Sequence, residues 1–126
     1  MRILTARLSD YANVAEGKMS LVGMFTQYHL PRVPFTVPPL YVSLEIETER
    51  NEQISIGARI ARPDGKPIGT LDFQNLRAPG NETTNRGWIT FIFTRQEFRA
   101  FGEHTIEILV GDDVVHSIPL SVNQRR

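Results

Sequence analysis

The chain has 126 residues, with 14 basic and 14 acidic side chains and no cysteine. This length fits one domain, residues 1–126, that buries a core without the help of a metal ion or a disulfide. The lack of cysteine excludes thiol catalysis, disulfide frameworks and thiolate metal sites, and the balanced charge argues against a nucleic-acid partner, which calls for positive charge gathered on one face.

The first predicted elements are a strand at about residues 2–8 and a polar, turn-forming link from Asp10 to Lys18. The link leads into a strand over residues 18–30 whose apolar side chains occupy both faces: Met19, Leu21 and Phe25 on one, and Val22, Met24, Tyr28 and Leu30 on the other. A strand needs cover on both faces only if it is central in a sheet or if its second face meets another chain. This strand therefore indicates packing or assembly.

The middle of the chain alternates between apolar and polar residues. Four prolines in residues 30–39 predict an extended crossover between two sheets. Strands are predicted over residues 40–47 and 54–60, and the turn signal at residues 63–66 joins the second of these to a strand over 68–76. A polar loop over residues 75–86 follows. It contains Asn81-Glu82-Thr83, which matches the N-glycosylation triplet and which we interpret as a chance match.

Strands are also predicted at about residues 87–93, 103–110 and 114–122, with one short helical turn before the second of them. Thr94 and Glu97 have the spacing of a capping box, Phe93 and Phe98 flank the turn as a hydrophobic staple, and Gly102 can end it. Seven or eight short strands with frequent turns predict an all-β fold, namely an antiparallel two-sheet β-sandwich of the Ig-like or Greek-key type.

Three histidines are candidate metal ligands: His29, His104 and His116. If residues 111–113 form a three-residue turn, Val110 pairs with Val114, Ile108 with His116, and His104 with Leu120. His104 and His116 then lie several residue pairs apart along the hairpin, so they cannot bind the same metal ion. We therefore expect no metal site, and we expect His116 to lie on the apolar face near Ile108 as a structural residue.

No other set of residues predicts catalysis. Glu45 and Glu47 are alternate residues on one strand face and resemble a glycosidase pair, but such a pair needs a cleft and one raised pKa. Their place on the polar side of an amphipathic strand predicts solvated carboxylates. The sequence has no nucleophile elbow, no Gly-rich phosphate loop and no calcium-loop spacing. We expect no enzymatic activity and no cofactor.

Surplus apolar side chains are the more informative signal. In the predicted strand over residues 87–93, one face is fully apolar, and Trp88 and Ile92 lie on the other. A sandwich buries one face of each sheet, so the surplus has the composition of an interface core. The alternative is that the crossover and the helical turn cover this face within the monomer. The residues expected at a contact are Met24, Tyr28, Trp88, Ile92, Arg95 and Arg99.

The chain resembles a family of small uncharacterised bacterial and phage β-sandwich proteins. The resemblance lies in Asp10-Tyr11-Ala12, Val14, Gly17-Lys18 and Leu21-Val22-Gly23, and continues through the proline-marked crossover to the last hairpin. These are mostly turn and core residues, so the resemblance implies the fold and transfers no catalytic residue.

We expect a non-catalytic interaction or assembly module that forms a homo-oligomer or binds a larger particle. Its most concrete form is a structural accessory or decoration protein of a phage virion or another multi-subunit particle. The alternative is a cytoplasmic binding module for a small ligand or peptide that uses a sheet edge or the loop over residues 75–86. No apolar stretch has the length of a membrane span or a signal peptide, so we expect no membrane partner and a place in the cytoplasm or, if phage-encoded, in the virion.

Overall fold

The computed structural model describes residues 1–78, 80 and 82–126, with the backbone alone at residues 69–72. Strands fill most of this part of the chain, and none of it is helical. The strands are β1 (Arg2–Ala15), β2 (Lys18–Met24), β3 (Gln27–Leu30), β4 (Phe35–Thr36), β5 (Leu40–Glu49), β6 (Gln53–Ala61), β7 (Pro67–Arg77), β8 (Thr84–Phe93), β9 (Glu97–Phe98), β10 (Gly102–Val110) and β11 (Asp113–Gln124). Within these described residues, no helix is long and apolar enough to cross a membrane.

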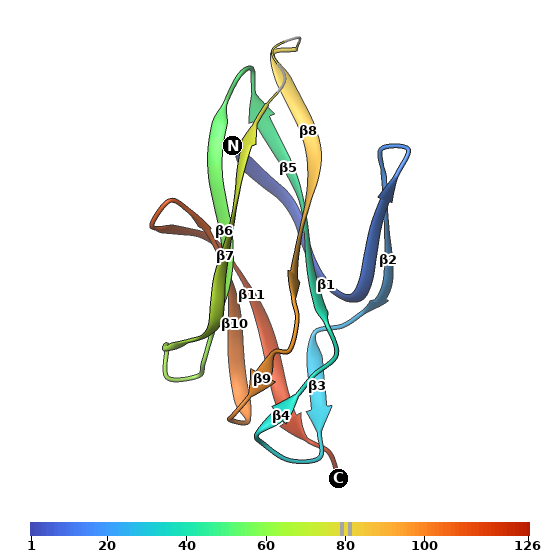
Figure 1. Ribbon diagram of the computed structural model, residues 1–126, viewed down its shortest axis with the longest axis vertical. Coiled ribbons are helices and arrows are strands. Elements are labelled where there is room, and N and C mark those ends of the chain that lie inside the picture. Colours follow the sequence, from blue (N-terminus) through green and yellow to red (C-terminus); the bar gives the residue numbers. More distant parts are fainter. Residues whose placement is uncertain (79, 81) are drawn as a thin grey trace.

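The strands form two large sheets and one small one (Figure 1). The four-stranded sheet has the order β2-β1-β5-β8, the five-stranded sheet has the order β3-β11-β10-β6-β7, and β4 pairs with β9. All of these pairs are antiparallel except β3 with β11, which is parallel. The predicted all-β fold class with antiparallel sheets is confirmed, but the described residues form more strands than the seven or eight predicted, and the parallel pair was not predicted.

The inward faces of the two large sheets supply one hydrophobic core. On β5, the predicted alternation is confirmed, because every second residue from Leu40 to Ile46 is buried. Burial of each such side chain stabilises the fold by about 1.5–3 kcal/mol. The largest fully buried apolar side chains of the core come from both large sheets and from β9 of the small one: Leu40, Leu44, Phe91, Ile56, Ile60, Ile106, Ile108, Leu120 and Phe98.

The region around the predicted link differs from expectation. Residues 10–15 extend β1, which forms a hairpin with β2 instead of a polar link. Glu16 and Gly17 close this hairpin, and both have positive φ, 54° and 72°, as a two-residue type I′ turn requires. The alternation in residues 10–15 is weak because this part of β1 does not cover the core, so the sequence carried little periodic signal there.

The strand predicted over residues 18–30 is two strands in different sheets. β2 belongs to the four-stranded sheet, whereas β3 lies parallel to β11 in the five-stranded sheet. The chain changes sheets at Phe25 and Thr26. The prediction that residues 30–39 cross between sheets is confirmed, because they lead from β3 back to β5 in the other sheet.

The helical turn predicted over residues 94–101 is wrong. Part of this segment forms β9, which pairs with β4 and places Phe98 in the core. Arg95 adopts a left-handed φ of 56°, which interrupts any helical turn. The Glu97 carboxylate accepts a hydrogen bond from Arg99 Nε at 2.6 Å instead of closing a capping box. Burial of a whole aromatic ring therefore outweighs the local helix signal.

The last hairpin confirms two predicted pairs, His104 with Leu120 and Ile108 with His116. The predicted three-residue turn and the pair of Val110 with Val114 are wrong: Val110 pairs with Asp113, so two residues close the turn. An extra residue, Val115, forms a bulge that restores the expected register at His116. His116 shares the face of Ile108, as predicted, but its side chain is exposed.

The tip of the polar loop predicted over residues 75–86 is only partly described. β7 extends to Arg77 and β8 begins at Thr84, so the loop is shorter than predicted. Asn81 of the glycosylation triplet lies outside the described residues.

Candidate interaction surface

The outer face of the four-stranded sheet carries a row of side chains that crosses all four strands. Ser9 pairs with Met24 on one side and with Tyr41 on the other, and Tyr41 pairs with Ile92. Directly opposite residues of antiparallel strands place their side chains on the same face. The inward neighbours of this row, such as Leu8 and Val42, lie in the core, so the row itself faces outward.

Large apolar side chains remain exposed along this row. We call the set formed by Tyr11, Val22, Met24, Tyr41 and Ile92 the outer apolar band. The exposed fraction is 63% for Met24, 59% for Val22, 49% for Tyr11 and 47% for Ile92. Trp88 follows two positions beyond Thr90 on the same face of β8 and is 36% exposed. Because the band is contiguous across the sheet, it differs from the isolated apolar side chains of ordinary surfaces.

The opposite end of the same face is charged. Glu47 lies between two arginines of the neighbouring strands, with Oε1 3.1 Å from Arg2 Nη2 and Oε2 3.4 Å from Arg86 Nε. Glu45 lies directly opposite Trp88 and is half-buried. Glu45 and Glu47 therefore lie on the outer surface of a sheet, but both are half-buried, and Glu47 is ion-paired with arginines instead of freely solvated as predicted. Two rows, Arg7–Ser43–Thr90 and Thr5–Glu45–Trp88, separate this charged row from the outer apolar band.

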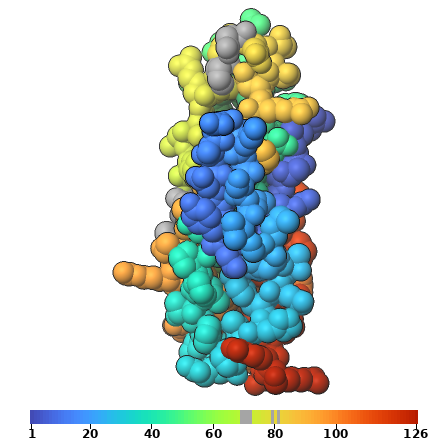
Figure 2. Space-filling model, turned by 90° about the vertical axis from the view of Figure 1, so that its right-hand side faces the viewer, coloured from blue at the N-terminus to red at the C-terminus, as the bar shows by residue number. Residues whose placement is uncertain are grey.

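The hairpin of β2 and the second half of β1 projects from the edge of the four-stranded sheet as an arm (Figure 1). We call residues 10–24 the hairpin arm. Seen from the right-hand side of Figure 1, the arm (blue) lies at the front of the molecule (Figure 2). Most of its residues are exposed, and its apolar side chains lie on both faces, with Val14 on one and Val22 on the other. A two-stranded hairpin without cover is marginally stable in water, so the arm gains from any contact that covers it.

The structure brings some of the predicted contact residues together and separates others. Met24 and Ile92 share one row, and Trp88 lies on the same face two rows away. Arg95 and Arg99 are exposed in the β8–β9–β10 connection, and Arg99 is paired with Glu97. They do not belong to the outer apolar band.

Tyr28 is half-buried and lies on β3 of the five-stranded sheet, so it does not belong to the outer apolar band. Its ring packs against Phe25 and Phe98, with ring centroids 4.7 and 5.6 Å away. Burial raises the pKa of the Tyr28 hydroxyl, and the negative charge of Asp10 raises it further. The sequence placed Tyr28 with Met24 because both share a parity, but the chain changes sheets between them.

His104 is fully buried beside the same aromatic cluster. Its ring meets Phe98 edge-on, with centroids 5.2 Å apart, and Nδ1 lies 3.1 Å from the carbonyl oxygen of Gly102. Nε2 is buried and has no hydrogen-bond partner among the described residues. Among the residues that the structure describes, no three His, Asp or Glu side chains lie close enough together to hold a metal ion.

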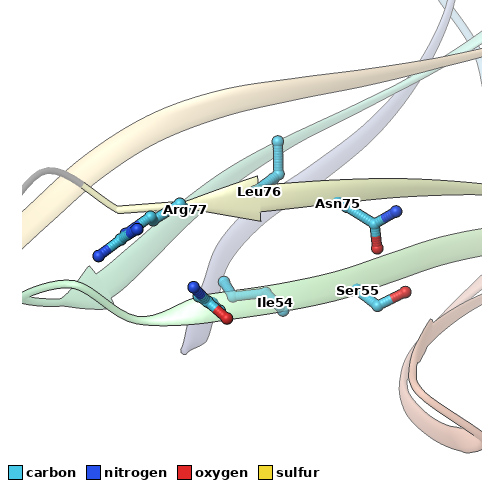
Figure 3. Close-up of a pocket in the computed structure, with 6 residues that line it drawn as sticks. Ile54, Ser55, Asn75, Leu76 and Arg77 are labelled. Atoms are coloured by element: carbon cyan, nitrogen blue, oxygen red, sulfur yellow. The ribbon is translucent and has the colours of Figure 1, made fainter.

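Two hollows lie near the loop that the alternative function invokes. One, of about 460 Å³, lies on the β6–β7 surface with Ser55, Asn75 and Arg77 at its rim (Figure 3). The other, of about 160 Å³, lies between the ends of the two sheets. It is lined by apolar residues, among them Ile54, Leu76 and Ile89, together with polar residues such as Thr48 and Arg77.

A family model for a family of unknown function (DUF6941) matches residues 4–123 of the chain. No curated protein matches it. Among solved structures, a β-glucosidase from Listeria innocua in complex with isofagomine is similar over 96% of this chain and 16% of its own, with a TM-score of 0.56 and 12% identity. The same enzyme in complex with glucose is similar over 79% of this chain and 15% of its own, with a TM-score of 0.55 and 13% identity. This chain thus spans 15–16% of the enzyme's length, and the likeness concerns the fold alone.

Proposed function

The chain belongs to this family of unknown function, and we propose that it is a non-catalytic assembly module that associates through the outer face of its four-stranded sheet. In this proposal the two large sheets are the layers of an Ig-like, Greek-key sandwich. Such a sandwich buries one face of each sheet, and the outer apolar band lies on the opposite face. The exposed band is the observation that carries the proposal.

The composition of the band supports a protein partner. Interface cores are enriched in tyrosine, tryptophan and methionine and depleted in charge. Tyr11, Tyr41 and Met24 of the band are of these types, as is Trp88 on the same face of the sheet. The arginine–glutamate row around Glu47 supplies a charged rim at one side. An apolar centre with a charged rim is the usual arrangement of a specific contact.

The most concrete form of this role is a structural accessory or decoration subunit of a larger particle, such as the virion of a phage, in a protein of bacterial or phage origin. The partner is then either a second copy of the chain or a shell protein of the particle. The protein is found in the cytoplasm or, if it is encoded by a phage, in the virion.

The native mass of the purified protein across a concentration series tests the proposal. We expect a defined oligomer by light scattering, and we expect Met24→Lys and Ile92→Lys to lower its mass, because each places a charge inside the band. Val114→Lys is the matched control, since Val114 is an exposed valine on β11 of the other sheet. A monodisperse monomer at the highest concentration would overturn self-association.

A binding module for a peptide is the second candidate, and the hollow between the sheet ends favours it. Its volume of about 160 Å³ is below that of a pocket for a drug-sized ligand but suits one apolar side chain of a peptide. This candidate predicts NMR shift changes confined to residues such as Leu76 and Ile89 when an apolar peptide is added. Unchanged shifts there would exclude it.

A further inference from the structure

β2 is an edge strand, and its backbone has one side free. Within the described residues, β1 is the strand with which it pairs. The residues that flank a two-residue hairpin turn form a hydrogen-bonded pair, and here these are Ala15 and Lys18. From that pair onward, the N–H and C=O groups of successive residues of β2 point to opposite edges of the strand. The backbone groups of Lys18, Ser20 and Val22 therefore point toward β1, and those of Met19 and Leu21 point toward the free edge.

The free edge of β2 lacks the features that usually protect edge strands. Natural edges carry charges, prolines or bulges, or are very short. β3 has four residues, β7 begins with Pro67, and the Thr90 carbonyl of β8 accepts a hydrogen bond from Gln74 Nε2 at 2.9 Å. β2 has no proline, and its one charge, Lys18, is at its beginning.

We propose that β2 pairs antiparallel with β2 of a second copy about a two-fold axis at Ser20. This inference rests on the proposed assembly role. The two four-stranded sheets then join into one. Gly23 has a φ of 69°, so the regular part of the strand ends before it, and Ser20 is the centre of the remaining residues 18–22. In this register Met19 lies opposite Leu21 of the second copy, and the two form hydrogen bonds through their free backbone groups.

The side chains of β2 are complementary to themselves in this register. Met19 and Leu21, both half-buried in the single chain, meet their counterparts on one face. Lys18 lies opposite Val22 of the second copy, so the two lysines are at opposite ends of the seam and no like charges face each other. On the other face, Val22 extends the outer apolar band across the axis. Each face of the hairpin arm thus continues into the same face of the second copy, and the free backbone edge of β2 is paired.

Charge pairs at Ser20 test the axis directly. Ser20 is exposed in the single chain, so Ser20→Lys and Ser20→Glu should leave the fold intact. Each places like charges next to each other at the axis, and we expect the dimer dissociation constant to rise by at least about tenfold. An equimolar mixture of the two variants should dimerise again. Ser117→Lys, at an exposed serine of β11, is the matched control.

The outcomes separate this inference from the proposed function. If the wild type assembles and the Ser20 variants assemble equally well, the edge pairing is overturned and the assembly role stands. If the single variants are monomers but their mixture stays monomeric, the axis at Ser20 is overturned. A wild type that is monomeric at every concentration overturns the edge pairing and self-association, and leaves a different protein as the partner in the assembly role.

Amide hydrogen exchange of the wild type gives a measurement that needs no variant. The amides of Met19 and Leu21 should become protected as the protein concentration rises, whereas those of Ser20 and Val22, which face β1, should be protected at all concentrations. Exchange at Met19 and Leu21 that does not depend on concentration overturns the edge pairing.

Discussion

The rings of Tyr11 and Tyr41 lie 5.5 Å apart and are inclined by 58°, and this contact joins the hairpin arm to the body of the molecule. Tyr11 belongs to the arm, whereas Tyr41 lies on β5 opposite Ile92. The pair therefore makes the outer apolar band continuous from the arm to the sheet edge at β8.

Tyr11→Ala should loosen the arm without unfolding the body. Tilted aromatic pairs contribute about 0.5–1.5 kcal/mol beyond their buried area, and the hairpin arm has little other cover. We expect faster amide exchange and proteolysis in residues 10–24, with a small change in melting temperature. Tyr11→Phe keeps the ring and should behave as the wild type. Equal protection of the arm in Tyr11→Ala would contradict the role of this pair.

The core strands were predictable from the sequence because their environment is periodic. β5 alternates from Leu40 to Ile46 since one face meets the core and the other does not. The pairing of His104 with Leu120 followed from residue counting, because a bulge at Val115 offsets the shorter turn. The register was correct here because the turn is one residue shorter than predicted and the bulge adds one residue.

The hairpin arm and the sheet change could not be predicted in the same way. Residues 10–15 do not cover the core, so no apolar period marks them as a strand. The change of sheet after Phe25 depends on contacts with distant elements, such as the hydrogen bond that Ser121 N–H of β11 donates to the Thr26 carbonyl at 3.3 Å. Met24 and Ile92 of the outer apolar band were predicted because they are apolar residues on the outward side of their strands. Tyr11 and Tyr41 were not predicted, because only the pairing register of β1 with β5 brings them together.

His104 should tolerate an apolar replacement but not a small one. Nε2 is buried without a partner among the described residues, which costs free energy in the folded state. His104→Leu removes this atom and keeps most of the volume, so we expect a free energy of unfolding within about 1 kcal/mol of the wild type. His104→Ala leaves a cavity beside Phe98 and should cost about 2–4 kcal/mol. Urea denaturation of both variants checks this, and equal losses would contradict it.

Tyr28 should stay un-ionised until the fold is lost at alkaline pH. Its pKa is raised in the folded state, first by burial and then by Asp10, above the value of 10.0 expected for an exposed tyrosine. A raised pKa contributes stability that is present below pH 10 and is lost as the pH rises through the folded-state value. Tyr28→Phe should therefore be less sensitive to alkaline unfolding. Tyrosinate absorbance from Tyr28, measured against this variant, should appear only with unfolding.

Glu52 links stability to acid pH through the amino group of Met1. Its Oε2 lies 2.8 Å from the Met1 ammonium, and its Oε1 accepts the Glu49 amide at 2.9 Å. The hydrogen bond from Met1, followed by that from Glu49, holds the pKa of Glu52 below its ordinary value of 4.5. A lowered pKa contributes stability that is present above pH 4.5 and is lost as the pH falls through the folded-state value.

Glu52→Gln should therefore destabilise the protein at pH 7 by up to about 1 kcal/mol, the range of partly exposed ion pairs. The difference from the wild type should shrink as the pH falls below 4, because the wild-type carboxyl then becomes neutral as well. Thermal unfolding at pH 7 and pH 3 measures both values. Acetylation of the Met1 amine should produce the same loss at pH 7 in the wild type and none in Glu52→Gln. A loss in the variant that is the same at both pH values would show that Glu52 acts through packing and not through its charge.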